Sequence, residues 1–143
     1  MLRALELAPG WSGAVGALEK AAARSGLDWR LHELVRMRVA LLNRCTVCMD
    51  WRNDAAFAAG VTEDLLRNVE RWSDHPGFTT AERVALEYTE RYCTDSAGID
   101  DALLARLGEH LDPATIVDLT LVIGKYVAMG RFMQVLGLSL IHI

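Results

Sequence analysis

Two cysteines, Cys45 and Cys48, are the residues of this sequence whose types and spacing point most directly to chemistry. A C-x-x-C pair can cycle between a dithiol and a disulfide, it can supply metal ligands, or it can be two small apolar residues of a helical core. Glu33 lies twelve residues before Cys45, and Arg52 lies four residues after Cys48, where a proton carrier would be useful. The pattern therefore leaves a redox site, a metal site and a packed core as three interpretations.

The metal interpretation is the weakest, because the remaining candidate ligands are scattered. A structural zinc site needs four ligands, usually as two close pairs. Outside the C-x-x-C pair and the last six residues, the sequence offers single thiol and imidazole groups without paired spacing: Cys93, His32, His75 and His110. We therefore expect no bound metal, while burial of the two thiols as core residues stays open.

The charge pattern argues against nucleic acid and anionic membranes as partners. The chain carries 15 basic and 19 acidic side chains, a net charge of −4, and its basic residues are scattered singly. No signal peptide is recognisable, and the longest apolar tract, from Ile116 to Leu138, is interrupted by charged side chains. We therefore expect a cytoplasmic protein, in which a C-x-x-C pair is catalytic or metal-binding rather than a permanent disulfide.

Length and composition predict a single domain over residues 1–137. A chain of 143 residues with 52% apolar side chains can bury one hydrophobic core. The last six residues, LSLIHI, read like the in-frame translation of a sequencing-library adapter. We expect residues 138–143 to be a non-native tail and assign no function to them, including His142.

Helices are expected throughout, so the predicted fold class is all-α. The sequence contains three prolines, and no alternating apolar pattern persists beyond a few residues. Gly26 stops the first helix, Thr62 can cap a later one, and Thr79 with Glu82 forms a capping box. The expected helices cover residues 11–24, 29–42, a stretch from the cysteines to Gly60, 63–72, 80–94, 100–110 and a long last helix from Pro113.

The last helix, which Asp112 caps and Pro113 starts, is apolar nearly all round. Such a helix is buried, either in the domain core or in a subunit interface. One bundle of this size offers limited room to cover it on every side, so we expect a homo-oligomer.

The helix over residues 29–42 and the helix that carries the cysteines are expected to form an antiparallel hairpin that turns just after Leu42. This arrangement places Glu33 opposite Arg52. Cys48 and Arg52 are four residues apart, so they would share one helical face. We therefore expect Glu33, Cys48 and Arg52 to converge.

The segment ELVRMRVALLNRCTVCMDWR resembles the core motif of the carboxymuconolactone decarboxylase / AhpD-like alkylhydroperoxidase family. That motif has a glutamate, a C-x-x-C pair twelve residues later and a histidine four residues after the second cysteine; Glu33, Cys45 and Cys48 match it. GVTEDLLRNVERW and FTTAERVALEYTERY are similar to the segments that follow, so the resemblance covers roughly residues 31–131. It implies an AhpD-like helical bundle that assembles as a trimer or a multiple of one.

The resemblance also implies a reaction and a role for each matched residue. By position, Cys48 is the thiol that attacks a small-molecule hydroperoxide, and Cys45 resolves the sulfenic acid into a disulfide. Glu33 is the distal base of a proton relay. An external dithiol resets the pair, and neither an organic cofactor nor a metal is implied. The expected activity is that of a thiol-dependent peroxidase, an antioxidant oxidoreductase.

Arg52 stands where the family has its relay histidine, and this departure changes the expected chemistry. Its charge can stabilise the thiolate of Cys48, which is the nucleophile. An arginine is effectively always protonated, however, and cannot hand a proton to a leaving alkoxide. Facing Arg52, Glu33 would be held ionised in an ion pair. The alternative for Glu33 is a solvated helix face or a pairing with Arg36 or Arg38 of its own helix. We therefore expect the proton donor to be water or another residue; His32, expected at a surface or an interface, is the nearest imidazole.

Two other functions stay open. One is a lyase of the decarboxylase type, acting on a small lactone carboxylate; its chemistry does not need redox cysteines, so the C-x-x-C pair counts against it. The other is a non-catalytic, redox-sensing helical oligomer, whose thiols oxidise but do not turn over with a dithiol. The missing relay histidine keeps this second alternative open.

Overall fold

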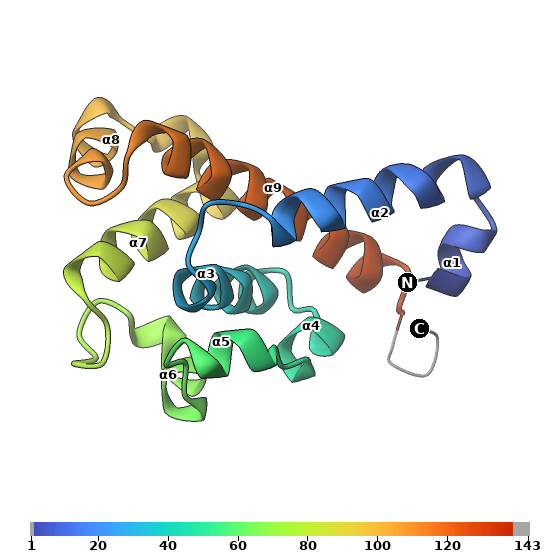
Figure 1. The fold of residues 1–143 in the computed structure, drawn as a ribbon, viewed down its shortest axis with the longest axis horizontal. Helices are drawn as coiled ribbons and strands as arrows, with labels where there is room; N and C mark the ends of the chain where they lie inside the picture. Colours follow the sequence, from blue (N-terminus) through green and yellow to red (C-terminus); the bar gives the residue numbers. More distant parts are fainter. Residues whose placement is uncertain (1, 139–143) are drawn as a thin grey trace.

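The computed structural model describes residues 2–138, and every regular element in that range is helical (Figure 1). The all-α fold class is therefore confirmed. Two short 3-10 turns, Val69–Arg71 and Ser96–Gly98, lie between helices. The helices are α1 (Leu2–Glu6), α2 (Pro9–Ala23), α3 (Trp29–Leu42), α4 (Thr46–Asp50), α5 (Asp54–Ala58), α6 (Glu63–Arg67), α7 (Thr80–Thr94), α8 (Asp101–Gly108) and α9 (Pro113–Val135).

Helix α3 runs through the middle of the fold, and all its residues from Leu31 to Ala40 are buried. It packs mainly on α7 and α9, and α4, α5 and α6 also contact it. Figure 1 shows it between the layer of α2 and α9 and the layer of α5 and α6. Because this stretch is covered on all sides, each polar residue on it needs a partner inside the protein.

Two apolar clusters hold α3 from opposite sides. One contains Val35 and Val39 of α3 together with Ile123 of α9. The other contains Leu34 of α3 together with Leu66 of α6. Helix α7 contributes to both clusters. Close packing of this kind fixes α3 as a rigid support for the side chains that project from it.

Several predicted cap residues lie where helices begin. Helix α3 covers the predicted segment residue for residue, and Thr79 and Glu82 form the predicted capping box at the start of α7. Asp112 accepts a hydrogen bond from the backbone N–H of Thr115 at the start of α9. Local side-chain chemistry is therefore enough to set these ends.

The expected continuous helix from the cysteines to Gly60 is wrong. Helix α4 ends at Asp50, and Trp51 is extended, with φ −70° and ψ 142°. Helix α5 begins only after the cap residue Asn53. Residues on the two sides of Trp51 therefore do not share a helical face.

Helix α9 is covered on one side only within the part of the chain that the structure describes. Leu119, Val122 and Ile123 are buried, whereas Val117 and Leu121 are 57% and 64% exposed. The expected burial all round is thus not reached within one chain. A subunit interface on α9 stays a prediction.

The division into one domain over residues 1–137 and a non-native tail also stays a prediction, because residues 139–143, with His142, lie outside the described range. Among the helices within residues 2–138, none has the length and hydropathy needed to cross a membrane.

Glu82 joins α3 to the start of α7. It is 7% exposed; one of its oxygens lies 2.5 Å from Arg30 Nε, and the other accepts a hydrogen bond from the Thr79 backbone N–H. We predict that Glu82→Ala lowers the free energy of unfolding by about 2–4 kcal/mol, because it removes a cap and leaves Arg30 without its carboxylate. Urea denaturation followed by circular dichroism measures this loss.

The matched control is Asp74→Ala, which breaks an ion pair with Arg71 on the surface. Exposed pairs contribute little to stability, so this variant should unfold almost like the wild type. Equal losses in the two variants would contradict the supporting role of Glu82.

Candidate functional site

The two cysteines lie at the start of α4 and are joined by a disulfide, with their Cα atoms 5.2 Å apart. Cys45 caps α4, and its sulfur accepts a hydrogen bond of 3.3 Å from the backbone N–H of Cys48. Arg44, the residue before, has a positive φ of 53°. The chain therefore turns sharply between α3 and α4, and Cys45 packs in a small cluster with Met133 of α9.

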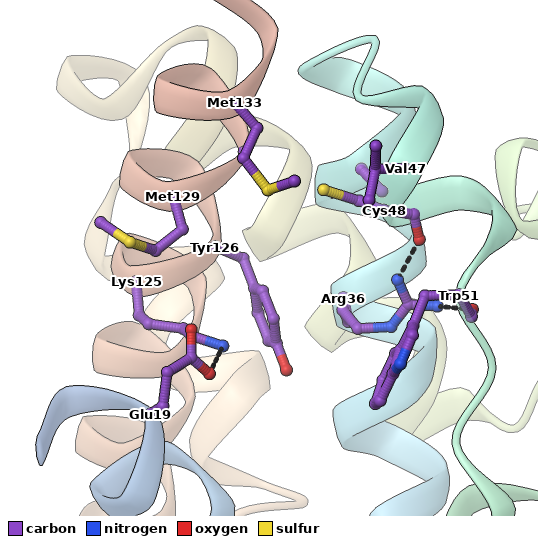
Figure 2. Close-up of a pocket in the computed structure, with 11 residues that line it drawn as sticks. Glu19, Arg36, Val47, Cys48, Trp51, Lys125, Tyr126, Met129 and Met133 are labelled. Atoms are coloured by element: carbon purple, nitrogen blue, oxygen red, sulfur yellow. Dashed lines mark hydrogen bonds and ion pairs between the residues drawn. The ribbon is translucent and has the colours of Figure 1, made fainter. Parts of the chain in front are cut away.

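The two sulfurs differ in access. Cys45 is 2% exposed, whereas Cys48 is half-buried and lines a cavity of about 300 Å³. Figure 2 shows Cys48 on one side of this cavity and Tyr126 and Met133 of α9 on the other. A molecule in the cavity would therefore meet Cys48 rather than Cys45.

The cavity wall is mostly apolar, and its polar side chains are few. Its apolar part comes from α3, α4, α9 and the residue after α4: Ala40, Val47, Trp51, Met129, Gly130 and Met133. Its charged and hydroxyl groups are those of Glu19, Arg36, Lys125 and Tyr126. Apolar walls with a small number of placed polar groups are typical of small-molecule sites.

Arg36 connects the cavity with the interior of the fold. Its guanidinium donates two hydrogen bonds, of 2.6 and 2.7 Å, to the carboxylate of Glu33, and both side chains are at most 3% exposed. It also donates to the backbone carbonyls of Cys48 and Trp51. In a continuous helix the Cys48 carbonyl would instead accept from the N–H of Arg52. The bonds from Arg36 therefore favour the end of α4 at this point.

The expected ion pair between Glu33 and Arg52 is wrong. Glu33 pairs with Arg36, while Arg52 pairs at 2.7 Å with Glu63 on the surface of α6. Cys48 and Arg52 do not share a helical face either, because α4 ends two residues before Arg52. Glu33 nevertheless stays beside the site, through Arg36.

His32 is buried, not at a surface as expected. It is 4% exposed, its ring stacks on that of Trp29 with centroids 5.2 Å apart, and its Nε2 lies 3.0 Å from the Tyr126 hydroxyl. Burial, and then the positive charges of Lys125 and Arg36, lower the pKa of His32 to about 4. The imidazole is therefore neutral at physiological pH.

Lys125 and Tyr126 stand side by side on α9 and differ in charge. The Lys125 Nζ lies 2.6 Å from a carboxylate oxygen of Glu19 on α2 and 3.7 Å from the centroid of the Tyr126 ring. Burial lowers the pKa of Lys125, and its bond to Glu19 opposes that shift. Burial raises the pKa of Tyr126, so the phenol stays protonated and can donate a hydrogen bond.

Residues 9–91, more than half of the chain, match the Carboxymuconolactone decarboxylase family. This chain belongs to the carboxymuconolactone decarboxylase family. Its Cys45 and Cys48 keep the C-x-x-C pair of the AhpD-like branch, and the predicted family is confirmed.

Two curated relatives and one solved structure are similar to this family member. Uncharacterized protein YnjA of Escherichia coli is 36% identical over 118 residues, which cover 82% of this chain but 64% of YnjA, less than two thirds. Uncharacterized protein YdfG of Bacillus subtilis is 29% identical over 133 residues, which cover 92% of this chain and 90% of YdfG. A protein of unknown function from Agrobacterium tumefaciens, for which a role as the antioxidant defence protein AhpD has been suggested, has a TM-score of 0.81 at 26% identity, over 90% of this chain and 89% of its own. The AhpD-like fold is therefore confirmed.

Sequence reasoning missed Lys125 and Tyr126 as site residues of this family member, and it considered Arg36 only as a possible ion-pair partner of Glu33, not as part of the cavity wall. Signals existed for Arg36 and Lys125. Arg36 stands three residues after Glu33, a spacing that favours an ion pair on one helix, and a lone lysine inside an apolar helix needs a carboxylate partner. Nothing in the sequence separates Tyr126 from an ordinary core tyrosine.

The remaining thiol lies outside the cavity wall. Burial raises the pKa of Cys93 to about 11, so this thiol is rarely ionised and is a weak nucleophile. Within residues 2–138, no three or more His, Cys, Asp and Glu side chains gather in a way that could hold a metal ion.

The neutral state of His32 predicts a loss of stability in acid. The His32 ring takes up a proton near pH 6.5 in the unfolded chain and near pH 4 in the folded chain. Between these values the unfolded state binds more protons, so the free energy of unfolding decreases as the pH is lowered. The groups that face the ring are Lys125, Arg36 and Asp28. We predict that the fall between about pH 7 and pH 4 is smaller in His32→Gln by about 2–3 kcal/mol.

Urea denaturation of both proteins across this pH range measures the difference, because the other titrating groups are common to the two. Parallel curves for wild type and His32→Gln would contradict the buried neutral imidazole.

Proposed function

We propose that this family member is a thiol-dependent peroxidase that reduces apolar alkyl hydroperoxides through a dithiol–disulfide cycle of Cys45 and Cys48. The different access of the two sulfurs carries this proposal: Cys48 lines the cavity, and Cys45 is buried behind it, at bonding distance. A hydroperoxide in the cavity would reach Cys48, and the sulfenic acid formed there would lie next to Cys45. The role suggested for the Agrobacterium tumefaciens relative agrees with this reaction.

The cycle consists of two displacements and a reduction. The thiolate of Cys48 attacks the outer oxygen of the hydroperoxide, so that an S–O bond forms, the O–O bond breaks and the alkoxide leaves as an alcohol after taking up a proton. The thiol of Cys45 then attacks the sulfenic sulfur; an S–S bond forms, the S–O bond breaks, and hydroxide leaves as water with the thiol proton. An external dithiol reduces the disulfide and is itself oxidised.

The shape and lining of the cavity support an apolar substrate body. Val47, Trp51 and Met129 offer hydrocarbon, aromatic and thioether surface, which binds apolar groups by excluding water. A volume of about 300 Å³ suits a small molecule. An organic hydroperoxide fits these walls better than hydrogen peroxide, which has no apolar part to bury.

Positive charge in this cavity favours the thiolate of Cys48. Arg36 bonds to the Cys48 carbonyl, and Lys125 lines the same cavity, so both lower the free energy of an anion there. Both oxygens of Glu33 accept from Arg36. We therefore assign Glu33 the task of holding Arg36 in place, and not that of a free base.

Arg52 is proposed to shape the turn after Cys48. It donates to the carbonyls of Met49 and Trp51, at 2.5 and 3.0 Å, and its pairing with Glu63 balances part of its charge. Its effect on the thiolate is accordingly expected to be weaker than that of Arg36.

An assembly of several copies is also proposed, with α9 in the contact. The exposed Val117 and Leu121 give this helix an apolar outer side, and covering such a surface with a second copy removes it from water. The family resemblance implies a trimer or a multiple of one.

The test of the proposed function is a mass measurement on the reduced protein after brief exposure to a stoichiometric alkyl hydroperoxide. The wild type should form the Cys45–Cys48 disulfide and lose the mass of two hydrogens, about 2 Da. Cys45→Ser should give a sulfenic acid on Cys48 that a dimedone-type reagent traps, whereas Cys48→Ser should give none. Unreacted thiols in all three proteins would overturn the proposal.

A second prediction concerns Arg52→Ala. Loss of this partly exposed charge should destabilise the Cys48 thiolate only slightly, because charges at the protein surface contribute about 1 kcal/mol or less. The rate of oxidation at neutral pH should fall several-fold, and the pH–rate profile should move to higher pH. Arg67→Ala, an exposed arginine on α6, is the control. An unchanged pH–rate profile would show that Arg52 does not influence the Cys48 thiolate.

A further inference from the structure

The peroxidase reaction needs a proton donor in the cavity, and the residues nearest to Cys48 cannot serve. An alkoxide is a strong base, so its departure is assisted by general acid catalysis. Arg36 is permanently protonated and is held by Glu33 and two carbonyls. Arg52 has the same chemistry and is bound to Glu63 at the surface. The donor is therefore either water or a group on another wall of the cavity.

The Tyr126 side chain is a neutral donor in that wall. It extends from α9 into the space between this helix and Arg36 (Figure 2), and it lines the same cavity as Cys48. Its hydroxyl contacts Nε2 of His32 at 3.0 Å. Lys125 and Glu19, the other polar groups on this side, are engaged with each other at 2.6 Å.

The tautomer of His32 sets the direction of this hydrogen bond. The ring is buried against Trp29 and lies near the positive charges of Lys125 and Arg36, so it is neutral and carries one N–H. With that hydrogen on Nε2, His32 donates to the phenol oxygen and leaves the phenol hydrogen free to point into the cavity. The same N–H, together with Lys125 at 3.7 Å from the ring centroid, would stabilise a phenolate.

Resting on the proposed peroxidase function, we propose that the Tyr126 hydroxyl is the catalytic acid that protonates the leaving alkoxide, and that His32, as the tautomer with its hydrogen on Nε2, is its positioning residue. As the Cys48 sulfur bonds to the outer oxygen and the O–O bond breaks, the phenol proton passes to the departing oxygen, which gives an alcohol and a tyrosinate. The tyrosinate then takes up a proton from solvent, which balances the proton that the Cys48 thiol released to solvent when it ionised. The route replaces the imidazole missing at position 52 with a group on α9.

Tyr126→Phe tests the proposal, because it removes one oxygen and keeps the ring. The single-turnover rate of disulfide formation is measured with an alkyl hydroperoxide and with a peroxy acid. The alkyl hydroperoxide releases an alkoxide, which is a strong base and needs a proton to leave, whereas the peroxy acid releases a carboxylate, which is a weak base and does not. We expect a loss of about 10²–10⁴-fold with the alkyl hydroperoxide and a far smaller loss with the peroxy acid. Tyr88→Phe, which removes a buried hydroxyl bonded to Thr120 away from the cavity, should behave like the wild type with both oxidants.

The outcomes separate this inference from the function on which it rests. Equal rates for Tyr126→Phe and wild type with the alkyl hydroperoxide, or equal losses with both oxidants, would overturn the acid role and leave the peroxidase proposal standing. A wild type that reacts with neither oxidant would overturn both.

The part assigned to His32 is tested by two substitutions. His32→Gln keeps an N–H donor near the phenol and should retain more of the alkyl hydroperoxide rate than His32→Leu, with little difference between them toward the peroxy acid. Equal rates for the two variants with the alkyl hydroperoxide would overturn the positioning role. Thermal melting of each variant, compared with the wild type, shows whether the fold is kept.

Discussion

The buried ion pair between Glu33 and Arg36 is the interaction on which the rest of the site depends. Removing two charges from water is costly, and their attraction offsets this only when their other hydrogen-bonding positions are filled. Arg36 meets that condition by bonding to the carbonyls of Cys48 and Trp51 as well as to Glu33. Its guanidinium also lies 5.3 Å from the centre of the Trp51 ring. The pair thus ties α3 to the segment that holds the reactive sulfur, and it contributes to the break between α4 and α5.

The same pair sets the electrostatics of the cavity. Arg36 and Lys125 both bring positive charge to its wall, and each is paired with one carboxylate, Glu33 and Glu19 respectively. Glu19 lines the same cavity and offsets part of the charge of Lys125, whereas Glu33 is not part of the cavity wall, so an anion at Cys48 meets mainly the positive charge of Arg36. The neighbouring imidazole of His32 stays neutral because burial, and then the two positive charges of Lys125 and Arg36, lower its pKa. One wall therefore favours a thiolate and keeps a neutral hydrogen-bonding pair beside it.

Features that depend on contacts within one helical turn were predictable from the sequence, whereas several features that depend on contacts between separate segments were not. The start of α7 follows from Thr79 and Glu82, whose contacts lie within one helical turn. The hairpin after α3 was also predicted, and Arg36 does reach across it to Cys48. The break at Trp51 was missed because the group that competes for the Cys48 carbonyl lies twelve residues earlier. The sequence left the partner of Glu33 open between Arg52 across the hairpin and Arg36 or Arg38 on the same helix, because an antiparallel register alone cannot rank them.

The arginine at position 52 is compatible with peroxidase chemistry only if the proton and the positive charge come from different groups. A histidine can supply both, as a cation beside the thiolate and as an acid toward the alkoxide. Here the charge is divided between Arg36 and Lys125, and the exchangeable proton lies on Tyr126 beside the neutral His32. A protonated phenol is a weaker acid than an imidazolium, so its transfer must be helped by stabilising the phenolate, which the cations near the ring can do. Lys125 is closest, at 3.7 Å from the ring centroid. Lys125, the lone lysine of an apolar helix, would then stabilise the phenolate of Tyr126 in addition to pairing with Glu19.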